Sequence, residues 1–142
     1  RIGLNSRLDT IQAAILIEKL KIFSEEVEKR ANVAAVYDRL LSEFIPTPHL
    51  RDGATSVWAQ YTLKCSSRNL LKEGLGTKGI PSVIYYPIPL HQQIGYRHYP
   101  VVSSGAGNSE LLAQNVLSLP MHPYLLPDEQ GEIAKVIKDI LN

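Results

Sequence analysis

The sequence is poor in cysteine, has no long apolar run and carries almost no net charge. Its single cysteine, Cys65, cannot form an internal disulfide, so we expect a protein of the reducing cytoplasm. No apolar run approaches the roughly 20 residues needed to span a bilayer. A net charge of +1 provides no basic face for nucleic acid. We therefore expect neither a membrane partner nor a nucleic-acid partner.

The sequence also lacks the residue spacing of a metal site and an N-terminal methionine. One cysteine and four scattered histidines lack the spacing of a metal site, and none is expected. The 142 residues suffice for one domain, but the sequence has no N-terminal methionine or signal pattern. We therefore expect a portion of a larger protein.

Glycine and proline are absent from residues 8–44, where apolar side chains recur every three or four positions. This spacing predicts a long helix. Ser24, followed by two glutamates, is typical of a helix start, so we expect a kink near Phe23. The kink would divide the chain into a motif loop with a linking helix, residues 1–23, and a small α+β domain, residues 24–142.

The remaining pattern alternates between strands and helices. Strict alternation predicts a strand over 56–65, and helical spacing predicts a final helix from Pro127. The other expected elements are a helix over 67–78, a strand over 81–86, a long loop over 88–108, a helix over 109–116 and a strand over 117–121. This order predicts an α+β fold, with a small, mostly antiparallel sheet covered by helices and preceded by the long kinked helix.

The first sixteen residues, RIGLNSRLDTIQAAIL, have the composition of an anion site. Gly3 permits close backbone approach, Asn5 offers an amide donor, and Arg7 offers a forked cation beside a helix N-terminus. The stretch resembles the Gly-x-Asn-x-Arg-Leu-Asp-x-Ile-Gln-Ala-Ala segment of the DegT/DnrJ/EryC1/StrS aminotransferases. The likeness runs over nearly the whole chain, whose element order resembles the C-terminal small domain of fold-type-I pyridoxal phosphate enzymes.

A second motif, IPSVIYYPIPLHQQ at residues 80–93, resembles another segment of the same family, Gly-Ile-Pro-x-x-x-Tyr-Tyr/His-Tyr-Pro-x-Pro-x-His. Prolines after a strand would hold Tyr85 and Tyr86 stiffly at a domain rim. Strand alternation would point the two rings to opposite faces, one of them into the core. We expect one of the pair, Tyr86 rather than Tyr85, to contact a ligand, with His91 as a further polar contact at the same rim.

The resemblance implies an enzyme that uses pyridoxal 5′-phosphate (PLP) to move an amino group from glutamate to a nucleotide-diphosphate keto sugar, at its 3-keto position. It implies a homodimer with shared active sites, in which Asn5 reaches the cofactor phosphate and Arg7, Tyr85, Tyr86 and His91 contact the substrate. The catalytic lysine would lie upstream of residue 1, so the chain would be inactive alone. The implied pathway makes bacterial surface polysaccharide or an amino-sugar metabolite.

Two other functions remain open. One is a PLP-dependent sugar dehydratase of the same family, in which histidine replaces the catalytic lysine. The other is a non-catalytic regulatory or dimerisation module. The lysines within the chain lie on polar helix or strand faces, whereas a Schiff-base lysine needs a partly desolvated position. None of them is predicted to be catalytic.

Overall fold

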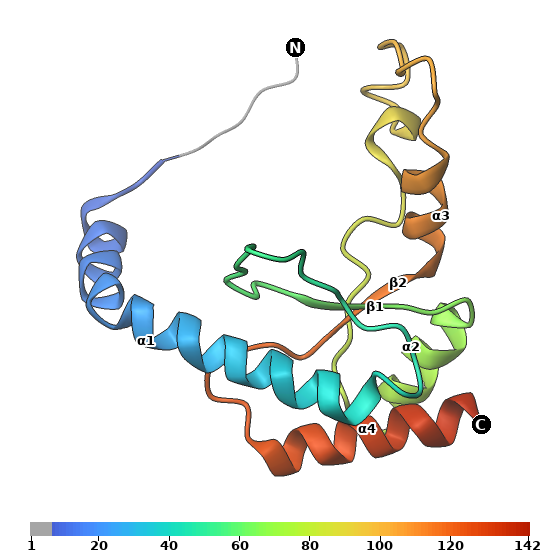
Figure 1. Ribbon diagram of the computed structural model, residues 1–142. Helices are drawn as coiled ribbons and strands as arrows, with labels where there is room; N and C mark the ends of the chain where they lie inside the picture. The colour runs from blue at the N-terminus through green and yellow to red at the C-terminus, as the bar shows by residue number, and fades with distance from the viewer. Residues whose placement is uncertain (1–6) are drawn as a thin grey trace.

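The computed structural model describes residues 7–142, which form four α-helices around a two-stranded sheet. In chain order the elements are α1 (Thr10–Leu41), β1 (Tyr61–Lys64), α2 (Arg68–Thr77), the 3₁₀ helix η1 (Leu90–Gln92), α3 (Gly107–Asn115), β2 (Val116–Leu119) and α4 (Pro127–Leu141). Figure 1 shows α4 running beside the C-terminal half of α1, with α2 near the same end. The predicted α+β class is confirmed.

Helix α1 is continuous over 32 residues. It begins at a capping box, in which the Asp9 carboxylate accepts the Gln12 backbone N–H at 2.8 Å. Ser24 starts no second helix, because neither proline nor glycine interrupts the backbone hydrogen bonds on either side of it. Figure 1 nevertheless shows the axis of α1 bending in its N-terminal part.

Strands β1 and β2 are antiparallel, and Tyr61 pairs with Leu119 and Lys64 with Val116 at the two ends of the ladder. The strand predicted over 56–65 is therefore shortened to four residues. The cause is Trp58, whose φ of 45° lies in the left-handed region and interrupts the extended backbone. The Trp58 side chain is buried in the core.

The predicted strand over 81–86 is wrong. Only Val83 pairs with β2, through a backbone N–H donated to the Ser118 carbonyl at 3.0 Å and a carbonyl that accepts the Ser118 N–H at 2.9 Å. Pro81 and Pro87 flank this single bridge, and a proline has no N–H to continue a ladder. The chain therefore leaves the sheet directly after Val83.

The hydrophobic core lies between the C-terminal half of α1, both strands, α2 and α4. Its polar atoms are paired: the Tyr37 hydroxyl donates to the Pro120 carbonyl at 3.1 Å, and the Gln130 side-chain amide donates to the Val33 carbonyl at 2.8 Å. Burial raises the pKa of Tyr37 well above its usual value. Within residues 7–142, no helix has both the length and the apolar composition to cross a bilayer.

Candidate functional site

The N-terminal half of α1 exposes apolar side chains on every side. Burial along this helix begins at Glu26, and the residues before it are largely uncovered. Large apolar side chains that are between 39% and 75% exposed there are Leu8, Ile11, Ile15, Leu16, Ile17, Leu20, Ile22 and Phe23. An apolar surface of this extent marks an interaction surface. The division of the chain between residues 23 and 24 stays a prediction.

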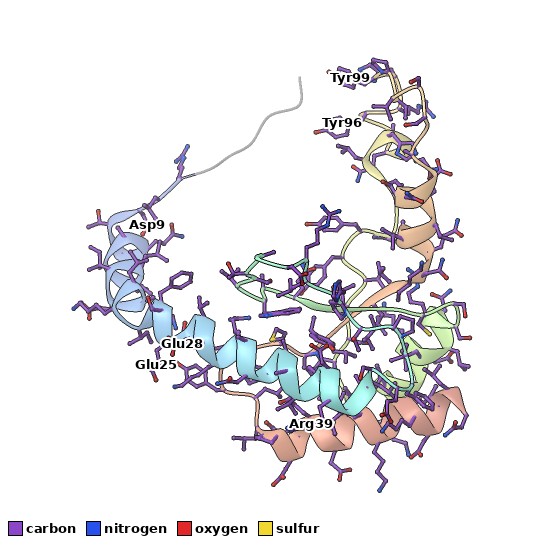
Figure 2. All side chains as sticks on the ribbon, viewed as in Figure 1. Asp9, Glu25, Glu28, Arg39, Tyr96 and Tyr99 are labelled. Carbon is purple, nitrogen blue, oxygen red and sulfur yellow. The ribbon has the colours of Figure 1, made fainter. Side chains whose placement is uncertain are left out.

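The first motif lies at the start of this exposed half. Arg7 is solvent-exposed, two positions before the capping residue Asp9, which Figure 2 labels at the beginning of α1. Asn5 lies outside the described residues. Arg7 is therefore exposed enough to contact a ligand. Its role, like that of Asn5, stays a prediction.

The tyrosines of the second motif lie just beyond the bridge at Val83. Tyr85 is 49% exposed and Tyr86 is 73% exposed, and their ring centroids are 6.4 Å apart. The expectation that one ring enters the core is wrong, because the segment is no longer paired as a strand. Both tyrosines are instead exposed.

The two tyrosines begin a long excursion that we call the arm, residues 84–106. The arm contains η1 and leads into α3, and Figure 1 shows it rising with α3 on the side of the sheet away from the start of α1. It carries histidine and arginine at positions 91, 97 and 98 but no aspartate or glutamate. This composition favours an anionic ligand over a cationic one.

His91 is tied to α3 by its side chain. Its Nε2 lies 2.9 Å from the Glu110 Oε1, and the two side chains are 22% and 44% exposed. The same histidine lines a pocket of about 350 Å³ together with Leu90, Tyr96, Tyr99 and residues 100–102. The sequence motifs did not identify Tyr96 and Tyr99, because aromatic residues in a loop carry no periodic signal.

A second polar cluster joins α1 to the segment before α4. The nearly buried Glu26 carboxylate accepts the Lys19 ammonium at 2.5 Å and the Tyr124 hydroxyl at 2.8 Å. The hydrogen bond from Lys19, followed by that from Tyr124, holds the pKa of Glu26 below its usual value, and the bond to Glu26 raises the pKa of Lys19. No sequence pattern predicted this contact, since Glu26 and Tyr124 are 98 positions apart.

A Schiff-base lysine needs a lowered pKa, whereas the two lysines near this cluster lie in environments that raise the pKa. Lys19 is paired with Glu26, and Lys29 lies 2.7 Å from Glu25, a contact that raises its pKa. These two lysines are therefore held as cations. Over residues 7–142, histidine, cysteine and acidic side chains form no group of three that could hold a metal ion.

Comparison with known proteins identifies the family. Residues 1–138 match the model of the DegT/DnrJ/EryC1/StrS aminotransferase family. The chain belongs to this family. It is 44% identical over 129 residues to the UDP-2-acetamido-2-deoxy-3-oxo-D-glucuronate aminotransferase of Pseudomonas aeruginosa, an alignment that covers 88% of this chain and 34% of that protein.

Two further relatives extend the comparison. The chain is 37% identical over 142 residues to the pleiotropic regulatory protein of Geobacillus stearothermophilus, covering 97% of this chain and 38% of the relative. The crystal structure of a DegT/DnrJ/EryC1/StrS aminotransferase from Brucella abortus superposes with a TM-score of 0.90 and 50% identity, covering 98% of this chain and 37% of that one. The chain thus spans little more than a third of the length of these proteins.

Proposed function

We propose that these residues form the C-terminal part of a PLP-dependent aminotransferase that moves an amino group from glutamate to a nucleotide-linked 3-keto sugar. The family match over residues 1–138 carries this proposal, together with the 44% identity to a relative named for a UDP-linked 3-oxo sugar. The product would enter bacterial surface polysaccharide or an amino-sugar metabolite. The single, buried, unpaired Cys65 supports a cytoplasmic location.

The described residues fit the edge of a PLP site and not its centre. When bound, PLP supplies the electron sink for amino-group transfer, and a lysine must hold it. Lys19 and Lys29 are held as cations by glutamates, so neither suits that task. As the resemblance to the family implies, we place the Schiff-base lysine upstream of residue 1 and assign to Asn5 a hydrogen bond to the cofactor phosphate.

The substrate contacts that we propose are Arg7, Tyr85, Tyr86 and His91. Arg7 can bind a carboxylate or diphosphate through two parallel hydrogen bonds. The exposed phenol groups of Tyr85 and Tyr86 can donate to phosphate oxygens.

We further propose a homodimer in which each active site draws on both chains. In the complete protein, Arg7→Ala and a variant of the upstream lysine should each fail to sustain turnover of glutamate and a UDP-linked 3-keto sugar to 2-oxoglutarate and the amino sugar. Mixed heterodimers should regain up to about half of the activity, because one of the two sites then holds both intact residues. Arg7→Lys should not restore activity, since an ammonium cannot make a forked contact.

The outcomes separate the alternatives. Heterodimers that remain inactive despite verified subunit exchange would contradict the shared site. Formation of a deoxygenated sugar in place of the amino sugar would instead identify the dehydratase of the same family. Lack of any sugar product in the wild-type protein would contradict the enzymatic proposal altogether.

A regulatory role is the second candidate, favoured by the name of the Geobacillus stearothermophilus relative. Its test uses the same lysine variant. Cells in which the variant replaces the wild-type protein should express their genes as wild-type cells do if the protein is a non-catalytic regulatory or dimerisation module. Gene expression that differs from the wild type once transamination is lost would trace the effect to the enzyme's product.

A further inference from the structure

The loop between α1 and β1 contains a tight turn centred on an aspartate–glycine pair. The Ala54 N–H donates to the Arg51 carbonyl at 3.0 Å, so Asp52 and Gly53 occupy the two central positions of a β-turn. Gly53 has φ of 75°, a conformation that glycine adopts without steric cost. Residues 51–55 are all exposed, and Figure 1 shows the loop extending beyond the start of β1. The pair is therefore accessible to water.

This pair differs from every other aspartate in the sequence. Asp52-Gly53 is the only aspartate–glycine pair, and no asparagine precedes a glycine. The other aspartates either cap a helix or lie within one, and each precedes a residue that has a side chain; they are Asp9, Asp38, Asp128 and Asp139. A side chain shields the backbone nitrogen that carries it, and a helix holds the backbone in one conformation. Both restraints are missing at residues 52 and 53.

The backbone nitrogen of Gly53 is free to react. The turn is closed by the Ala54 N–H, and no backbone carbonyl of residues 7–142 accepts the Gly53 N–H. A Cβ added at Gly53 would have no atom within 4 Å, so neighbouring groups leave the pair room to move. Bonding of the Gly53 nitrogen to the Asp52 carboxyl carbon closes a five-membered ring, and intramolecular reactions of this kind are favoured by proximity.

We propose that Asp52-Gly53 is a site of spontaneous covalent modification, at which aspartate isomerises to isoaspartate through a cyclic imide. The Gly53 nitrogen attacks the carbon of the protonated Asp52 carboxyl group, a C–N bond forms, and the hydroxyl group leaves with the proton of the nitrogen as water. Water then opens the ring. Attack at the side-chain carbonyl restores aspartate, whereas attack at the main-chain carbonyl breaks the original peptide bond and leaves the chain joined through Cγ. No oxidant or reductant takes part.

The modified turn differs from the original in two ways. The main chain gains Cβ as an additional atom between the Arg51 carbonyl and the Ala54 N–H, so we expect the hydrogen bond that closes the turn to be lost. The main-chain carbonyl of Asp52 also becomes a free carboxylate. Isoaspartyl methyltransferases esterify this α-carboxylate, so an enzyme of that class is the partner that the modified turn fits.

Ageing of the complete protein in neutral buffer, followed by digestion and mass spectrometry, tests the proposal. Cleavage after lysine releases residues 30–64 as one peptide, which contains Asp38 as an internal control for Asp52. Electron-transfer fragmentation distinguishes isoaspartate from aspartate. It should find isoaspartate that accumulates with time at residue 52 and none at Asp38. Equal amounts at the two positions, or none at either, would overturn the proposal.

Three variants check the chemistry. Asp52→Glu keeps the charge but would require a six-membered ring, which closes far more slowly, so the isoaspartate signal should be lost. Asp52→Asn should react faster, with loss of ammonia in place of water, because an amide is neutral at pH 7 whereas a carboxyl group is mostly ionised. Gly53→Ala should slow the reaction, since a methyl group shields the nitrogen. An isoaspartate signal that persists in Asp52→Glu would contradict the assignment to residue 52.

The role of the fold has a separate control. Ageing in guanidinium chloride gives the rate for the unfolded chain. Because the turn is exposed and its central N–H is free, the folded protein should isomerise at a comparable rate. A reaction that is much slower in the folded protein would show that its structure protects the pair, and would overturn the proposal.

Discussion

Gly74 marks a point where α2 approaches α4 so closely that a side chain has no room. A Cβ added at Gly74 would lie 2.6 Å from the Ile140 Cδ1 and 2.9 Å from its Cγ1. Gly76, two positions further along the same helix, would have no atom within 4 Å of an added Cβ. The two glycines therefore form a matched pair that differs in packing but shares the same helix.

The expected free energies of unfolding follow from two opposing effects. Replacing a glycine in a helix by alanine stabilises the helix by up to about 1 kcal/mol. Overpacking a core costs about 1–3 kcal/mol. Gly76→Ala should therefore stabilise the protein by up to about 1 kcal/mol, whereas Gly74→Ala should destabilise it by about 0–3 kcal/mol, the difference of the two terms.

Urea unfolding monitored by circular dichroism measures both variants, with an unchanged m-value required for the comparison. Ile140→Val provides the internal control, because it removes the Cδ1 atom that an added methyl group would meet most closely. In the wild-type background this change should cost about 0.5–1.5 kcal/mol, and in the Gly74→Ala background it should cost less. Equal stabilities for Gly74→Ala and Gly76→Ala would refute the packing argument.

Two other predictions concern buried polar groups. Because hydrogen bonds from Lys19 and Tyr124 lower the pKa of Glu26 in the folded state, Glu26 stabilises the fold above its usual pKa of 4.5, and this contribution is lost as the pH falls through the folded value. Glu26→Gln should therefore show a weaker loss of stability than wild type between pH 6 and pH 3 in thermal melts, and an identical acid profile would contradict this role. Gln130→Met should cost about 0.5–1.5 kcal/mol by removing the bond to the Val33 carbonyl. Gln130→Glu should cost more at pH 7 than at pH 4, because only a protonated carboxyl can donate to that carbonyl; a penalty independent of pH would count against it.

The helices could be predicted from the sequence because their signals are local. Pro127 occupies the first position of α4, and the apolar stripe that follows it faces the core. Gly79, with φ of 71°, follows the C-cap residue Lys78 of α2, and the Ile80 N–H bonds back to the Leu75 carbonyl at 3.0 Å. Each of these features depends on neighbours within one or two turns.

The strands were harder to predict because their limits depend on distant partners. Trp58 continues the alternating pattern of its segment, but its carbonyl accepts the Arg30 guanidinium at 3.1 Å, and its backbone leaves the extended region. Likewise, Val83 pairs with Ser118 for one bridge only, so the tyrosines after it are exposed. The motif thus identified the two tyrosines as candidate ligand contacts, although the strand that was expected to hold them does not form.

The candidate site was predicted only where a family motif covers it. Arg7, Tyr85, Tyr86 and His91 were expected from the two motifs, and the structure adds that the His91 ring is bound to Glu110. Glu110 lies on α3 and was not expected, because a contact between a loop histidine and a helix glutamate has no characteristic spacing. The same reason explains why the pocket around Tyr96 was missed.

The distribution of burial along α1 bears on the proposed division of the chain. An isolated helical segment shorter than about 12–15 residues is marginal in water, so most helices in proteins are stabilised by packing of an apolar face. The C-terminal half of α1 has that packing, against α4 and the sheet, whereas the half before Glu26 exposes apolar side chains on all sides. The first half therefore needs a covering surface that the other residues described by the structure do not supply. A large domain that lies upstream of residue 1, as in a protein about three times as long, would supply it, and we propose that residues 1–23 belong structurally to that domain.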